Sequence, residues 1–151
     1  MNLQRSLFVV ALLFLLALTF IPIAGAAPQA HPSYLHALAD LRDARAHLQR
    51  PDGGALQHQE QDAIAEIDKA IGEIKAASID DGKNIDDHVP VDDHMPWAGR
   101  LHKTADLLGK AFKDVNMEED DPAARGLKHR ALEHIRLAQR HVQEAIAIVH
   151  S

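Results

Sequence analysis

The chain has 151 residues, a formal net charge of −6 and no cysteine. The lack of cysteine excludes disulfides, thiolate metal ligands, a cysteine nucleophile and covalent attachment of haem. An acidic balance without a basic stripe argues against nucleic acid as a partner, because phosphate binding depends on lysine and arginine.

The first 26 residues have the pattern of a secretory signal peptide. Arg5 makes the start positive, residues 7–21 form a nearly unbroken apolar run, and Ala24-Gly25-Ala26 supplies the small residues that signal peptidase reads. The apolar run is short for a membrane span, which favours cleavage. We expect cleavage after Ala26, with Ala27 and Ala30 as alternatives.

Export follows from this interpretation. We expect a periplasmic or secreted protein without stable membrane insertion after cleavage, in which residues 27–151 form one domain. Loss of the leader removes Arg5 and no acid, so the formal net charge changes from −6 to −7. A mature chain of about 125 residues is long enough to bury one core without disulfides.

The mature sequence predicts four amphipathic helices, because apolar residues recur three and four positions apart and Gly and Pro fall between the runs. We expect the helices at about residues 33–49, 55–78, 97–115 and 122–149. Pro96 stands at the start of the third helix, and Asp121 followed by Pro122 is a start signal for the fourth. Each helix is marginal alone, so the four must pack together.

Two of the three connections are short, which favours antiparallel neighbours. We therefore predict an all-α, up-down-up-down four-helix bundle. The connection between the second and third helices, residues 79–95, is longer than such a bundle requires. Long loops in compact domains are usually functional or disordered, so we look for function there.

This long loop contains one pattern twice: apolar, Asp, Asp, His, apolar, Pro, at residues 85–90 and 91–96. Carboxylate oxygen and imidazole nitrogen together suit zinc, copper or nickel, and the prolines reduce the entropy lost on binding. The alternative is a solvated acidic loop whose Val89, Val91 and Met95 cover the end of the core. The predicted metal ligands are Asp86, Asp87, His88, Asp92, Asp93 and His94.

Histidine is the compositional outlier, with eleven residues, all after the leader. It is the commonest metal ligand and titrates near neutral pH. If the helices alternate in direction, the long loop lies at the end that holds the starts of the first and third helices and the finish of the fourth. Seven histidines would gather at that end: His31, His36, His88, His94, His102, His141 and His150.

Two further groups of polar residues are interpreted as surface. Glu60 points with Ile64 toward the core side but lies near a helix start, so we expect it at a solvated end. The second group forms a stripe on the first helix, with its members spaced four, three and four residues apart, and we expect this stripe to be exposed to solvent. Its members are His36, Asp40, Asp43 and His47.

The sequence does not predict an enzyme. It contains no nucleophile with a matching base, no glycine-rich phosphate loop and no inward histidines that would hold haem. Part of the sequence resembles short exported bacterial helical proteins of uncharacterised function, and this resemblance covers most of the mature chain and implies no activity. The matching segments are Tyr34-Leu35-His36-Ala37-Leu38 to Arg45 and Ile79-Asp80-Asp81-Gly82-Lys83-Asn84.

Two functions follow as hypotheses. The first is reversible binding of a divalent transition metal by the repeated Asp-Asp-His loop. The second is a metal-free structural or protein-interaction module of the cell envelope, with an envelope protein as its partner. In the second hypothesis the histidines are ordinary surface residues or pH-sensitive contacts.

Overall fold

The structure is a computed structural model that describes residues 32–49, 57–77, 82, 84–92, 94–118 and 125–151. All of these belong to one compact unit, His31–Ser151. The predicted leader and its cleavage sites lie outside the described residues. Where the structure is described, it contains four helices and no strand, so the all-α prediction is confirmed.

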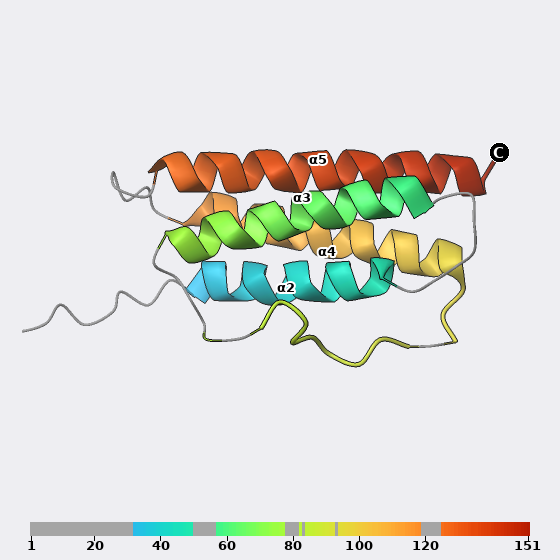
Figure 1. Cartoon of the computed structure of the whole chain (residues 1–151), viewed down its shortest axis with the longest axis horizontal. Coiled ribbons are helices and arrows are strands. Elements are labelled where there is room, and N and C mark those ends of the chain that lie inside the picture. Colours follow the sequence, from blue (N-terminus) through green and yellow to red (C-terminus); the bar gives the residue numbers. More distant parts are fainter. Residues whose placement is uncertain (1–31, 50–56, 78–81, 83, 93, 119–124) are drawn as a thin grey trace, which may run out of the picture. The chain divides into compact units, whose positions relative to one another are not determined.

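The four helices lie close to their predicted positions (Figure 1). The third predicted helix starts where expected, directly after Pro96, and ends where Glu118 takes an extended backbone conformation. The start signal of the fourth predicted helix lies outside the described residues. The bounds are α2 Pro32–Leu48, α3 Gln57–Ala76, α4 Trp97–Met117 and α5 Arg125–Val149.

The helices pack as a bundle around one core. α2 and α5 each contact both α3 and α4, so in the described part α2 lies diagonally opposite α5, and α3 lies opposite α4. The buried side chains recur three and four positions apart along each helix, as the amphipathic pattern predicts. Full burial of one large aliphatic side chain stabilises the fold by about 1.5–3 kcal/mol. The largest such side chains are Leu38, Leu41, Ile67, Ile74, Leu101, Leu108 and Ile135.

The expected up-down-up-down order is wrong, because α3 and α4 run in the same direction. Trp97 Nε1 donates a hydrogen bond to Glu60 Oε1 at 3.0 Å, which joins the start of α4 to the start of α3. The backbone N of Ser33 donates to Glu118 Oε1 at 3.0 Å, which joins the start of α2 to the end of α4. Figure 1 shows the resulting order: α2 and α5 run one way, and α3 and α4 run the other.

The length of the α3–α4 connection permits this order. The helix bounds leave residues 77–96 between α3 and α4. A 21-residue helix such as α4 is about 30 Å long, whereas roughly 20 extended residues reach about 66 Å. The connection can therefore return along the whole bundle. Short connections join the other consecutive helices, which are antiparallel as expected.

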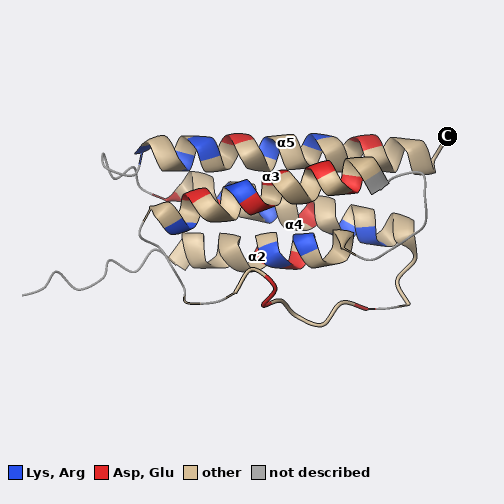
Figure 2. Cartoon of the chain, viewed as in Figure 1, with Lys and Arg blue, Asp and Glu red and all other residues tan. Residues whose placement is uncertain are grey.

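The outer faces of the bundle carry both signs of charge. Figure 2 shows acidic and basic residues distributed along the helices, without a long stripe of one sign. Within the described part of the chain, no helix combines the length and apolarity needed to cross a membrane.

Candidate functional site

Residues 84–92, which we call the strap, are attached to the surface of α2. Arg45 Nη1 donates to Asp86 Oδ1 at 2.7 Å, and the backbone N of Val89 donates to Asp43 Oδ1 at 3.0 Å. Arg45 also donates through Nε to Asp68 Oδ1 of α3 at 2.7 Å. One arginine therefore connects the strap to two helices.

The first Asp-Asp-His copy folds into a turn of its own. The backbone N of Asn84 donates to Asp87 Oδ2 at 2.8 Å, and the backbone N of Asp87 donates back to Asn84 O at 3.2 Å. Short polar side chains often bind neighbouring backbone groups in this way. The carboxylates of Asp86 and Asp87 thus stabilise the shape of the strap.

The second copy forms a separate turn that leads into α4. The backbone N of His94 donates to Asp92 Oδ1 at 2.9 Å, and the backbone N of Met95 donates to Asp92 O at 3.3 Å. Asp93 lies outside the described residues. The two copies are therefore alike in sequence but have different surroundings.

The ring of His88 contacts the backbone of the next residue. Its Nδ1 lies 2.7 Å from Val89 O, and a carbonyl oxygen only accepts hydrogen bonds, so Nδ1 carries the proton. The His88 side chain is exposed, and it lines an open surface hollow together with Asp43 and Asp87.

The structure does not bring the described members of the predicted ligand set together. No group of three or more His, Asp or Glu side chains in the described ranges is arranged to hold a metal ion. The prediction that the six residues form a metal site stays a prediction, since Asp93 is not described. The alternative was a solvated acidic loop in which Val89 helps to cover the end of the core. This is wrong for Val89, which is 66% exposed.

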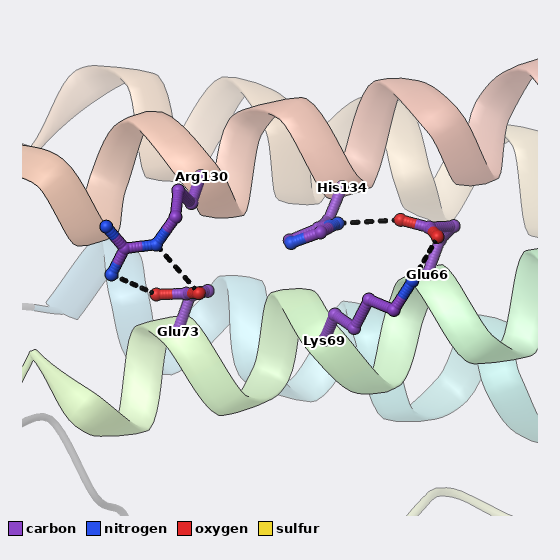
Figure 3. A network of polar contacts seen from close by, with 5 residues as sticks. All are labelled: Glu66, Lys69, Glu73, Arg130 and His134. Atoms are coloured by element: carbon purple, nitrogen blue, oxygen red, sulfur yellow. Dashed lines mark hydrogen bonds and ion pairs between the residues drawn. The ribbon is translucent and has the colours of Figure 1, made fainter.

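A second group of polar side chains joins α3 to α5 (Figure 3). Glu66 accepts hydrogen bonds from His134 Nδ1 and from Lys69 Nζ, both at 2.6 Å. Glu73 accepts from Arg130 Nε at 2.9 Å and from Nη2 at 2.8 Å, which is a bidentate pair. Because the two contact sets lie about two turns apart on α3, they fix the register of the antiparallel pair.

These contacts shift the ionisation of both glutamates. Burial would raise the pKa of Glu66, but the hydrogen bonds from Lys69 and His134 outweigh it and lower the pKa. The hydrogen bonds from Arg130 hold the pKa of Glu73 below its usual range, against a smaller opposing effect of burial. The arrangement is that of a structural clamp, because every described carboxylate in it faces a cation of the protein itself.

A third polar group is buried where α4 begins. Arg100 is 1% exposed, and its Nη1 donates to the backbone O of His47 at 2.6 Å, which satisfies a carbonyl at the end of α2. Glu60 and His47 are also buried, so the expectation that both lie in solvent is wrong. The cause is the direction of α4, which brings Trp97 and Arg100 over the start of α3 and the end of α2.

Sequence reasoning missed the burial of Arg100 and of Arg42, both 1% exposed. A signal was available for Arg100, which lies three residues after Trp97 and four before Thr104, on the apolar stripe of α4. A similar signal existed for Arg42, which lies four residues after Leu38 and four before Ala46 on α2.

The predicted gathering of seven histidines is wrong in part. His36 lies near the start of α2, which meets the end of α4, whereas His102 and His150 lie together at the opposite end, with ring centroids 5.9 Å apart. His88 belongs to the strap beside α2. His31 is outside the described residues. The separation follows from the same reversal of α4.

Comparison with known protein families, with curated proteins and with solved structures gave no match.

Proposed function

We propose that the chain is an exported, non-enzymatic helical bundle that acts as a protein-interaction module of the cell envelope, with the strap as its contact segment. The observation that carries this proposal is the attachment of the strap to α2 while Val89 remains 66% exposed. Export rests on the leader sequence and on the resemblance to exported bacterial helical proteins.

The strap has the properties of a prepared contact segment. Asp43 and Arg45 hold it at two points, so little backbone freedom is left to lose on binding. A single exposed valine is ordinary on a protein surface. Val89 differs from such a residue in its backbone. Its N–H donates to Asp43, and the exposed Pro90 that follows has no N–H, so neither residue presents a backbone donor that a partner must satisfy.

Photo-crosslinking in native cells tests this proposal. A photoreactive residue at position 89 should give one discrete adduct in the envelope fraction, which Asp43→Ala should weaken. Ile148, an exposed hydrophobic on α5 with 42% exposure, is the matched control position. Equal adducts at both positions, or none at position 89, would contradict the proposal.

Export is tested separately. We expect protein recovered from the envelope or the medium to begin at Ala27, because Ala24-Gly25-Ala26 is the preferred cleavage sequence. N-terminal sequencing reads this directly. A chain from the envelope or the medium that still begins at Met1 would contradict the proposed cleavage.

Metal binding by the repeated Asp-Asp-His loop is a second candidate, supported by His88. Histidines that bind metals almost always donate their other ring N–H to a carbonyl or a carboxylate, and His88 Nδ1 has such a contact with Val89 O. Calorimetric titration with zinc, copper and nickel tests this candidate. Binding weaker than about 1 mM, or affinity unchanged in a His88→Ala, His94→Ala variant, would exclude it.

A further inference from the structure

Two histidines from different helices lie together at the end of the bundle where α4 begins and α5 ends. The ring centroids of His102 and His150 are 5.9 Å apart, and the ring planes are tilted by 39°. His102 lies in the second turn of α4, and His150 directly follows the last residue of α5. Both side chains are exposed, so the rings can turn without disturbing the core.

The distance between the rings matches the coordination of one metal ion by both. A metal–imidazole bond is about 2.0–2.1 Å long, which places the ion about 3.2 Å from each ring centroid. Two such rings are then about 5.2 Å apart at a tetrahedral angle and about 6.4 Å apart on opposite sides of the ion. The observed 5.9 Å lies between these limits.

We propose that His102 and His150 form a two-imidazole site for a divalent transition-metal ion, which links the start of α4 to the end of α5. Water fills the remaining coordination positions, since the described residues do not supply a third ligand there. Imidazole ligands suit copper, nickel and zinc, and copper(II) binds most tightly in that series. This site is separate from the strap and does not depend on the function proposed for it.

The site would act on stability. One ligand comes from α4 and the other directly follows α5, so a metal ion held by both favours the native packing of α4 on α5. A ligand that binds only the native state raises the melting temperature, and at 100 times its Kd the rise is roughly 8 °C for a domain of this size.

Thermal unfolding of the untagged chain with copper(II), nickel(II) or zinc(II) alone tests the proposal. We expect Tm to rise with the metal concentration, most strongly with copper, and His102→Ala or His150→Ala each to weaken binding at least tenfold. With zinc, NMR spectra of the imidazole nitrogens should shift at these two residues and not at the exposed His58 of α3.

Matched variants separate this site from the strap. His58→Ala and the His88→Ala, His94→Ala pair should keep the metal-induced rise in Tm. If His102→Ala unfolds, His102→Gln preserves the size of the side chain and serves in its place. A rise in Tm that survives loss of either His102 or His150, a rise abolished only by the His88→Ala, His94→Ala pair, or binding weaker than about 1 mM would each overturn the proposal.

Discussion

Glu60 shows how the surroundings of a single residue control its ionisation. The side chain is buried, and burial raises its pKa above 4.5, with the hydrogen bond from Trp97 opposing the rise only in part. The folded state therefore holds the Glu60 proton more strongly than the unfolded state does. It follows that the free energy of unfolding falls as the pH rises from the unfolded pKa through the folded one.

We expect Glu60→Gln to stabilise the protein at pH 7. The amide oxygen still accepts the hydrogen bond from Trp97, while the cost of a buried charge disappears. The expected gain is on the order of 1 kcal/mol, or a few degrees in Tm, and it should vanish at about pH 3, where Glu60 is neutral in both states. Calorimetric melting curves at several pH values check this.

Trp97→Phe is the control for this pair. It removes the donor and leaves the Glu60 carboxylate buried, so we expect a loss of about 1–3 kcal/mol at pH 7. A Glu60→Gln variant that melts below the wild type at pH 7 would contradict the account.

Glu66 behaves in the opposite way, because its pKa is lowered in the folded state. Its contribution to stability is fully present above the unfolded pKa and is lost as the pH falls through the folded pKa. We expect Glu66→Gln to reduce stability at pH 7 by about 1–2 kcal/mol and to lose less on acidification than the wild type does. Urea unfolding at pH 7 and pH 3 measures both effects.

Glu133→Gln, on the exposed side of α5, is the control for Glu66→Gln and should change stability by less than about 0.5 kcal/mol. An acid-induced loss of stability that is the same in Glu66→Gln and in the wild type would show that the Glu66 contacts of the clamp do not contribute to it.

At the scale of elements, the strap is a segment without regular structure that is held to a helix by side chains. Its contacts with α2 come from Asp43 and Arg45, two residues apart on α2. Ile85 of the strap also packs, partly buried, against the core. Opening the strap still exposes less apolar surface than opening a helix, so its local stability is expected to be below that of the helices.

Asp43→Ala should loosen the strap at Val89 without unfolding the bundle. We expect faster hydrogen exchange of the Val89 amide and a change in global stability below about 0.5 kcal/mol. Asp43→Asn is the matched control, because its side-chain oxygen still accepts a hydrogen bond from Val89 N. Equal exchange at Val89 in both variants would argue against this contact.

For the whole molecule, the direction of α4 determines which residues meet at each end. The chain has no cysteine, so a spin label on Met117→Cys attaches at one position only. Met117 is 63% exposed at the end of α4. We expect the label to broaden the amide signals of Ser33 and Tyr34 and to spare that of His47. An up-down-up-down bundle would give the reverse.

The number and bounds of the helices could be predicted because they depend on local patterns. Apolar spacing and the position of Pro96 placed α4 at residues 97–115, against the observed Trp97–Met117. The candidate site was predicted less well. The repeated Asp-Asp-His pattern identified an unusual segment, but the partners of its side chains, Asp43 and Arg45, lie on α2, about forty residues away in sequence.

The sequence alone determined that this protein has four amphipathic helices and a long connection with a repeated motif, because these features depend on residues within a few turns of one another. Tertiary structure decided the direction of α4, the burial of Glu60 and Arg100, and the pairing of His102 with His150. A connection of this length permits either direction for α4, so its choice depends on packing between helices that are distant in sequence.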